Sequence, residues 1–250
     1  QGVMICITGD THGGFQRFGN KYFPQQREMS RDDYMIISGD FGGLWDGSAE
    51  ENYWLNWLED KPWTTLWVDG NHENFDMLKR LPVEEWKNGR VQRIRPHILR
   101  LLRGKAYEID GLTFFTMGSA SSHDIQDGIL DPSAPDFERE YWWKRRTRQR
   151  FRVLGHSWWP DELPSDEEYL TALATLERIG WRADCVITHC APSRIVRRLN
   201  PDYTTDRLND FLDMVDQRLE FQYWFFGHYH DNQAVDDRHI LLWEQIVQLL

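Results

Sequence analysis

The first 73 residues of this chain contain the same unit three times, and this repetition constrains the fold more than any other feature of the sequence. In each unit a short apolar run leads into a loop that contains glycine and polar residues of metal-binding types. The runs are residues 3–8, 34–38 and 64–68, and the loops are Gly9–Gly14, Gly39–Gly43 and Asp69–Glu73. The loops follow one another at intervals of roughly 30 residues, the length of one βαβ unit. The sequence therefore predicts parallel strands whose carboxyl ends bring these loops together at one edge of a sheet.

The segment between the second and third units has the pattern of a connecting helix. Residues 50–59 place Tyr53, Trp54, Trp57 and Leu58 at helical spacing. We expect these four side chains to face inward, because an amphipathic helix buries its apolar stripe against the sheet.

The rest of the chain predicts shorter strands and two further helices. Strands are expected at residues 98–102, 112–117, 184–188, 222–226 and 240–243, and helices at 165–179 and 206–219. The strands at 98–102 and 112–117 are assigned to a second sheet, which 240–243 would close. Ser165 followed by Glu168 is typical of a capping box at a helix start.

Length and charge narrow the class of protein. With 250 residues the chain is near the upper end of one domain, so we predict a single α/β domain over residues 1–250 with an insertion at about 119–164 that has a helical middle. The net charge of −11 argues against sequence-independent binding to DNA or to an anionic membrane. No segment approaches the roughly 18 apolar residues of a membrane span, and no secretory leader is recognisable. We therefore expect a cytoplasmic protein without membrane contacts.

The candidate metal ligands are carboxylate, imidazole and amide groups. The three cysteines form no CxxC pair, so neither a disulfide framework nor a thiolate zinc site fits the sequence. Polar groups instead follow five expected strands directly, where apolar side chains would cover the sheet at lower cost. These residues are Asp10, His12, Asp40, Asn71, His72, His189, His228 and His230.

This ligand chemistry suits borderline divalent metal ions such as Mn, Fe, Zn, Co or Ni. Seven ligands are too many for one tetrahedral site. Two metal ions that share one carboxylate are the simplest arrangement.

The order and spacing of these residues resemble the five sequence blocks of the calcineurin-like metallophosphoesterases. The blocks are Gly9-Asp10-Thr11-His12, Gly39-Asp40, Gly70-Asn71-His72-Glu73, His189 and Gly227-His228-Tyr229-His230. The segment Ser119–Asp124 is similar to one found in small bacterial and phage members of the family. The resemblance spans nearly the whole chain. It implies a four-layer α/β/β/α sandwich of two mixed β-sheets flanked by helices, with a dinuclear metal centre at the strand ends.

The resemblance also implies a role for each of these residues. Asp10, His12 and His230 would hold one metal ion, Asn71, His189 and His228 would hold the other, and Asp40 would bridge the two. A hydroxide that bridges the metal ions would attack the phosphoryl group in line, without a covalent enzyme intermediate. His72 would be the catalytic residue that stabilises developing charge or protonates the leaving oxygen. Manganese is the metal we expect first.

The chain departs from the phosphoprotein phosphatases at three positions. Those enzymes resemble this sequence around Asp10 and Asn71, but they carry an Asp and an Arg after the bridging Asp and an Arg before the Asn-His-Glu block. Here Gly43, Leu44 and Asp69 occupy these positions. The Asp that orients the catalytic His is therefore missing in register, and Asp46 replaces it only if the loop bulges.

We expect the insertion to supply the missing substrate contacts. His123 is a candidate to reach the edge of the metal centre, and a structural role in the loop is the alternative. Arg145 and Arg146 belong to a basic run over residues 144–152 that suits bidentate phosphate recognition, with a solvated helix face as the alternative.

The predicted function is hydrolysis of phosphomonoesters on a protein or a small molecule. A phosphodiesterase or nuclease that acts on nucleotides or nucleic acid is the alternative, although the acidic chain does not favour nucleic acid as a partner. A catalytically inactive scaffold is the third reading, and the presence of all seven ligand positions and His72 argues against it. The sequence leaves the oligomeric state open.

Overall fold

Three parallel strands form the centre of the first sheet, because their side chains can be buried on both faces. The computed structural model describes residues 2–250 and places β1 (Ile5–Thr8), β2 (Tyr34–Ile37) and β3 (Thr64–Trp67) side by side in parallel. Every residue of these strands is buried. Ile36 faces the second sheet, while its neighbour Ile37 faces the outer layer, as the alternation of a strand requires.

The first sheet has seven strands in the order β15-β1-β2-β3-β6-β5-β4. Its outer strands are β4 (Val83–Trp86), β5 (Gly89–Arg95), β6 (Ile98–Leu101) and β15 (Val247–Gln248). β6 runs parallel to β3, whereas β4, β5 and β15 pair in the antiparallel sense. The sheet is therefore mixed.

The second sheet has six strands in the order β13-β14-β12-β11-β8-β7. Its strands are β7 (Lys105–Ile109), β8 (Leu112–Met117), β11 (Cys185–Thr188), β12 (Tyr223–Phe226), β13 (Gln233–Ala234) and β14 (His239–Leu241). β8, β11, β12 and β14 are parallel, and β7 and β13 are the antiparallel edges. β11 and β12 end at the same edge as β1 to β3, which positions their histidine loops near the aspartate loops.

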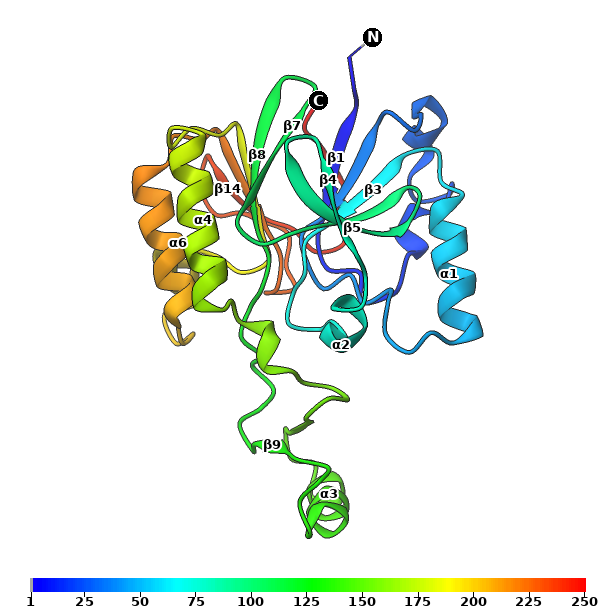
Figure 1. Ribbon diagram of the computed structural model, residues 1–250, viewed down its shortest axis with the longest axis vertical. Coiled ribbons are helices and arrows are strands. Elements are labelled where there is room, and N and C mark those ends of the chain that lie inside the picture. Colours follow the sequence, from blue (N-terminus) through cyan, green and yellow to red (C-terminus); the bar gives the residue numbers. More distant parts are fainter. Residues whose placement is uncertain (1) are drawn as a thin grey trace.

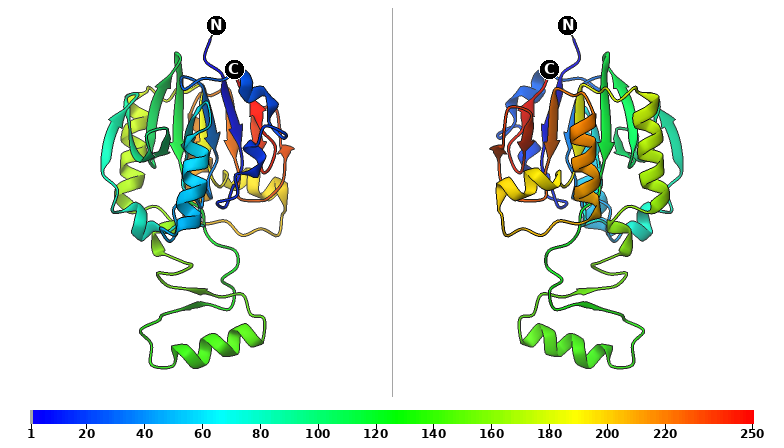
Figure 2. Two further views of the ribbon diagram at one scale, coloured as in Figure 1. Left: turned by 90° about the vertical axis from the view of Figure 1, so that its right-hand side faces the viewer. Right: turned by 90° about the vertical axis from the view of Figure 1, so that its left-hand side faces the viewer.

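Helices cover the outer faces of both sheets. Figure 1 shows α1 on one side of the pair of sheets and α4 and α6 on the other, and Figure 2 turns the molecule to show the same layers edge-on. The helices are α1 (Ala49–Glu59), α2 (Phe75–Leu78), α3 (Phe137–Arg146), α4 (Asp166–Arg178), α5 (Ser193–Leu199) and α6 (Arg207–Arg218), and the short 3₁₀ turns are Gln16–Phe18, Pro24–Glu28 and Pro160–Glu162. Separate buried clusters fill the spaces between α1 and the first sheet, between the sheets, and between the second sheet and α4 to α6. The four-layer α/β/β/α sandwich is therefore confirmed.

One strand lies in a different sheet from the one predicted. Ile98–Leu101 is β6 of the first sheet, hydrogen-bonded between β3 and β5, and not part of the second sheet. The preceding hairpin explains the difference, because β4 and β5 carry the chain outward and back to the open edge of β3. The prediction missed β4, β5 and β7. It placed residues 240–243 correctly in the second sheet, although β13 and not β14 is its edge.

The helix predictions were largely confirmed. The side chain of Ser165 accepts a hydrogen bond from the N–H of Glu168, and the side chain of Glu168 accepts one from the N–H of Ser165 in return, so the capping box exists. The inward face of α1 was partly wrong. Tyr53 is 61% exposed, and Leu55 joins Leu58 as the buried pair.

The segment between β8 and α4 projects from the edge of the sheets at which β1 to β3 end (Figures 1 and 2). It contains a two-stranded parallel ladder of β9 (Ile129–Leu130) and β10 (Arg152–Val153), and α3 lies at its tip. None of the helices in residues 2–250 combines the length and the apolar character needed to cross a bilayer.

Candidate metal centre

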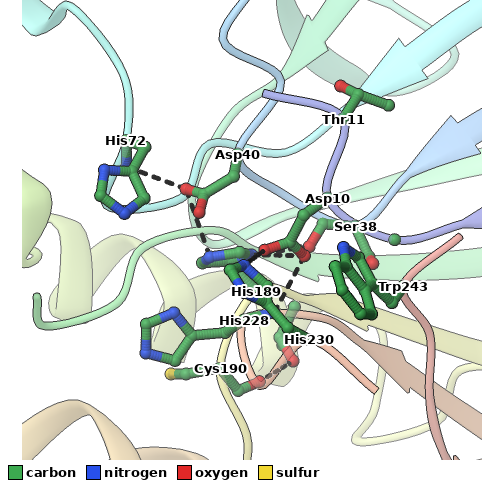
Figure 3. Close-up of polar contacts among 12 residues, drawn as sticks. Asp10, Thr11, Ser38, Asp40, His72, His189, Cys190, His228, His230 and Trp243 are labelled. Atoms are coloured by element: carbon green, nitrogen blue, oxygen red, sulfur yellow. Dashed lines mark hydrogen bonds and ion pairs between the residues drawn. The ribbon is translucent and has the colours of Figure 1, made fainter. Parts of the chain in front are cut away.

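The edge where the central strands end carries two groups of carboxylate and imidazole side chains (Figure 3). One group consists of Asp10, His12 and His230, and the other consists of Asp40, His189 and His228. Within each group, one ligand atom from each residue lies within 4.8 Å of the other two. Each group could hold a metal ion. The loops after β1, β2, β11 and β12 supply these side chains, so residues distant in sequence converge through the topology.

The first group is open to solvent on one side. Asp10 is 1% exposed, whereas His12 and His230 are exposed at the surface. Asp10 Oδ2 lies 3.2 Å from His230 Nε2 and 3.5 Å from His12 Nε2. The two Nε2 atoms are 3.3 Å apart. The indole of Trp243 stacks on the ring of His230 with a centroid distance of 5.2 Å, which fixes the orientation of that ring (Figure 3).

The second group is more deeply buried. His189 is fully buried, and its Nδ1 donates to the carbonyl oxygen of Ser38 at 2.8 Å. This hydrogen bond leaves Nε2 as the atom that faces the centre, the arrangement usual for a histidine that binds metal. His228 belongs to the same group, and its backbone N–H donates to Asp10 Oδ1 at 2.9 Å, which ties the two groups together.

Asp40 lies between the two groups. Its Oδ1 is 3.3 Å from Nε2 of His189, and its Oδ2 is 3.7 Å from Nε2 of His12. One oxygen therefore faces each group. This is the position that a shared carboxylate needs.

The backbone at the centre adopts conformations that are unusual for these residue types. His12, Asp40, His228 and His230 all have positive φ, with values of 48°, 49°, 73° and 49°. Residues other than glycine rarely adopt this left-handed region, and such residues cluster at functional sites. The turns direct the side chains of the ligands toward one another.

Two glycines allow the ligands to approach this closely. A Cβ atom at Gly39 would overlap the ring of His189, and one at Gly70 would overlap the carboxylate of Asp40. The Gly-Asp and Gly-Asn pairs in the sequence therefore have a steric cause.

Several buried polar atoms at the centre lack a hydrogen-bond partner among the described residues. They are Asp10 Oδ2, Asn71 Oδ1 and His189 Nε2. A buried polar atom without a partner is costly, and a carboxylate oxygen, an amide oxygen and an imidazole nitrogen are all atoms that divalent ions accept as ligands. The amide of Asn71 is oriented by its Nδ2, which donates to Ser122 Oγ at 3.2 Å, so its Oδ1 remains free. The residues present fit a pair of divalent ions.

Charge within the centre shifts the pKa values of the ligands strongly. Burial alone would lower the pKa of His189, but the charges of Asp40 and Asp10 outweigh it and raise this pKa to about 10. Burial likewise opposes ionisation of Asp40, yet His189 lowers the pKa of that carboxyl to about 2. Without metal, His189 therefore carries a proton that an incoming ion must displace, so the affinity for metal rises with pH in the range below about 10.

His72 belongs to neither group and lies beside Asp40 (Figure 3). Its backbone N–H donates to Asp40 Oδ1 at 2.8 Å, and its ring centroid is 5.3 Å from that of His12. Burial lowers the pKa of the His72 imidazole, the charge of Arg152 lowers it further, and the charges of Asp40 and Asp124 raise it. His72 therefore lies next to both groups without being a member of either.

Two aspartates at and near the departures from the phosphoprotein phosphatases, Asp69 and Asp46, have structural contacts here. Asp69 is fully buried and pairs with Arg100 at 2.9 Å and with Arg103 at 2.8 Å. The carboxylate of Asp46 accepts a hydrogen bond from the N–H of Ser48 at 2.8 Å, so it caps the turn before α1.

The insertion supplies a charged pair near His72 instead. Arg152 forms a salt bridge with Asp124, and both residues influence the pKa of His72. This pair was not predicted from the sequence, because 28 residues separate its members and neither directly follows a strand of the large sheets.

The three candidates for substrate contacts lie in different places. Nε2 of His123 is 2.7 Å from Nε2 of His228, so this residue reaches the edge of the second group. Arg145 lines a cavity inside the insertion, whereas Arg146 is not among the residues that line it. Glu162 was not predicted from the sequence; it is 2% exposed and accepts a hydrogen bond from Ser122 Oγ at 2.6 Å. Glu162 thereby supports Asn71 through Ser122.

Comparison with known proteins agrees with this geometry. The family model of calcineurin-like phosphoesterases matches residues 3–232, which is most of the chain. No curated protein matches the sequence. Members of the family are metal-dependent hydrolases of phosphoesters, and the paired carboxylate and imidazole groups lie within the matched range. The family match agrees with the two mixed sheets and with the ligand groups at their common edge. The chain belongs to the calcineurin-like phosphoesterase family.

Proposed function

We propose that this protein hydrolyses phosphomonoesters on a protein or a small molecule with the help of two divalent metal ions. The position of Asp40 carries the proposal, because its two oxygens face the two ligand groups at 3.3 and 3.7 Å. One ion would be held by Asp10, His12 and His230. The other ion would be held by Asn71, His189 and His228, and Asp40 would bind both ions. When bound, such ions polarise phosphoryl oxygens and lower the pKa of water toward neutrality.

The protein's own residues bind and orient the substrate and supply a proton. His72 donates a hydrogen bond or a proton to the leaving oxygen, where negative charge develops as the phosphorus–oxygen bond breaks. Asp40 holds the backbone N–H of His72, so the carboxylate expected to bind both ions also fixes the catalytic imidazole. Arg152 and Asp124, which pair with each other in the insertion, are close enough for their charges to influence the pKa of His72.

A phosphodiesterase that acts on nucleotides or on the end of a nucleic acid is the second candidate. The arginines of the insertion support it, because the side chains of Arg145 and Arg150 form no ion pair within residues 2–250. The net charge of −11 disfavours a long nucleic-acid strand.

The two candidates are separated by comparing p-nitrophenyl phosphate with bis-p-nitrophenyl phosphate. Metal-stripped protein is resupplied in parallel with Mn, Ni, Zn or Mg. We expect turnover of the monoester, restored best by Mn. Faster turnover of the bis-ester would favour the phosphodiesterase, and no turnover with any bound metal would contradict both.

His72→Ala tests the role of the catalytic imidazole. We expect the variant to keep both metal ions and to lose about 10²–10⁴-fold in kcat, the usual contribution of a positioned acid or base. The loss should be larger for an alkyl phosphate than for p-nitrophenyl phosphate, because the alkoxide needs protonation more. His97→Ala is the control, since His97 pairs with Glu59 outside the centre. An equal loss for both substrates would argue against proton donation.

Manganese and a cytoplasmic location are also proposals. The mixed carboxylate and imidazole ligands support manganese without excluding other borderline ions. All three cysteines are free and buried, which is compatible with a reducing compartment. Metal analysis of protein purified without added metal, and fractionation of the source cell, test the two proposals.

A further inference from the structure

We propose that the cavity inside the insertion binds the leaving group of the substrate, and that this group belongs to a nucleotide with a second phosphate, such as a nucleoside bisphosphate. The inference rests on the proposed phosphomonoesterase function. Water would attack the phosphate at the metal centre, the phosphorus–oxygen ester bond would break, and the ester oxygen would take up a proton. The products are inorganic phosphate and a nucleoside monophosphate, whose remaining phosphate and base occupy the cavity.

The cavity is large enough for such a group. Its volume is about 810 Å³, within the range of roughly 300–1,000 Å³ typical of small-molecule sites. Its walls come from α3 and from the chain that returns through β10, both of which belong to the insertion. The cavity lies outside the core of the sandwich, since the three buried clusters of the sandwich include no residue of α3.

The cavity approaches the metal centre where its wall meets the segment that carries His123. Asp124 and Arg152 line the cavity and form a salt bridge with each other. The residue before Asp124 is His123, whose Nε2 lies 2.7 Å from Nε2 of His228. A phosphate at the metal centre and a group in the cavity would therefore lie on either side of one short segment.

Positive charge in the cavity favours an anionic group. Arg145, Arg150 and Arg152 line it, and Asp124 is the carboxylate among the lining residues. Asp124 is already paired with Arg152. No carboxylate pairs with the guanidinium groups of Arg145 and Arg150 in the described chain. Nη1 of Arg145 donates to the hydroxyl of Tyr141 at 3.1 Å, which leaves its other N–H groups, with those of Arg150, to bind a phosphate. This local positive charge contrasts with the net charge of −11 of the whole chain.

Aromatic rings in the same walls favour a planar base. The centroid of Tyr141 lies 5.7 Å from that of Phe137 and 5.6 Å from that of Phe151, and all three residues line the cavity. Phe137 and Tyr141 belong to α3, which has no buried residue, and Phe151 is half-buried, so the three rings are only partly covered by protein. Aromatic faces next to guanidinium groups are a common way of binding nucleobases and phosphates together.

Calorimetry with adenosine 3′,5′-bisphosphate tests the site on metal-stripped protein, without any turnover. We expect binding by the wild type and at least tenfold weaker binding by the double variant Arg145→Gln/Arg150→Gln. Arg139→Gln is the matched control, because Arg139 lies on the same helix, carries the same charge and does not line the cavity. Phe151→Leu is the second variant, and it should weaken binding of the bisphosphate but not of pyrophosphate.

Other results of the binding experiment would contradict the site or the identity of its ligand. No binding by the wild type, or equal weakening by Arg139→Gln, would overturn the site. Tighter binding of a phosphotyrosine peptide with the same dependence on Arg145 and Arg150 would overturn the assignment to a nucleotide.

Kinetics separates this inference from the proposed function. With metal restored, the double variant should raise KM for the bisphosphate about tenfold and leave glycerol 2-phosphate, which is too small to reach the cavity, unchanged. An equal change for both substrates would overturn the inference while the phosphoesterase function stands. Absence of turnover for every ester, with bisphosphate binding still dependent on the two arginines, would overturn the function and leave the binding site intact.

Discussion

The sandwich and the insertion are built in opposite ways. In the sandwich, the reacting groups follow strands that are buried on both faces, and tight turns hold them in fixed positions. In the insertion, α3 has no buried residue and the only sheet is a pair of two-residue strands. With the proposed function, we infer a division of labour, in which the sandwich would hold the metal ions and the insertion would determine which substrates reach them.

The two regions are nevertheless joined at the base of the insertion. Asn71 Nδ2 donates to Ser122 Oγ at 3.2 Å, and Ser122 Oγ donates to Glu162 at 2.6 Å. Trp159 Nε1 donates to the carboxylate of Asp76 at 2.8 Å. The ends of the insertion are therefore fixed to the metal centre, whereas its tip depends on its own few contacts.

Hydrogen exchange should show the largest difference between the regions. Amides of β2 are expected to exchange only by global unfolding, while those of α3 exchange by local opening. With a stability of at least about 5 kcal/mol, the protection factors should differ by more than about a thousandfold. Mass spectrometry of peptides from the two regions measures this ratio. Equal protection of α3 and β2 would mean that the insertion folds as part of the sandwich.

Removing one carboxylate from each region should give the next largest difference. Asp40→Asn should lose both metal ions and lower kcat/KM by more than about a thousandfold, because roughly 4 kcal/mol of transition-state stabilisation depends on the ions. Asp136→Asn, at the exposed start of α3, should leave both unchanged. Metal analysis together with p-nitrophenyl phosphate turnover checks the pair. Activity in metal-bound Asp40→Asn would refute the shared-carboxylate arrangement.

The strand ends of the sandwich could be predicted because each carries its own local pattern. An apolar run, a glycine and a polar ligand are adjacent in sequence at Gly39-Asp40 and Gly70-Asn71, and the steric need for those glycines is equally local. The hairpin turn at Asp110-Gly111 was also available as a signal for β7, since Asp-Gly is typical of tight hairpins. The turn between β4 and β5 consists of Lys87 and Asn88, because Trp86 pairs with Gly89, so the Asn-Gly pair marks this hairpin one residue out of register.

Other features depend on contacts that no local pattern records. β6 joins the first sheet because a hairpin returns the chain to the free edge of β3, and periodicity cannot identify that neighbour. The hydrogen bond between Asn71 and Ser122 spans 51 residues, and the one between Ser122 and Glu162 spans 40. The support for the metal centre that comes from the insertion was therefore not predictable from the sequence.

Ser122→Ala tests the contact between the two regions. The variant removes the acceptor that orients Asn71, and loss of such outer contacts typically lowers metal affinity by about 10–100-fold. We expect weaker binding of the metal ion that Asn71, His189 and His228 would hold, and we expect the fold to remain intact. Ser121→Ala is the matched control, because Ser121 precedes Ser122 and has no side-chain hydrogen bond in the described chain. Metal titration measures the two affinities. An unchanged affinity in Ser122→Ala would show that the amide is held without the insertion.

The smallest difference is expected from two turn aspartates. In the sandwich, burial opposes ionisation of Asp236, but hydrogen bonds from the N–H groups of Arg238 and His239 and from the His239 ring lower the pKa of its carboxyl to about 2. Because this pKa is lowered on folding, the carboxylate stabilises the protein above its ordinary pKa of 3.8, and the stabilisation is lost as the pH falls through about 2. Asp131 makes similar contacts with Ser133 in the insertion, but it is fully exposed.

Asp236→Asn should therefore lower the free energy of unfolding at pH 6 by about 1 kcal/mol, a value that allows for screening by solvent. The deficit should shrink toward pH 3, where the wild-type carboxylate begins to take up its proton. Asp131→Asn should leave the urea midpoint unchanged at both pH values, because α3 and its turns can open while the sandwich stays folded. An equal shift for both variants would mean that the turn of the insertion is coupled to the stability of the sandwich, contrary to the division of labour between the two regions.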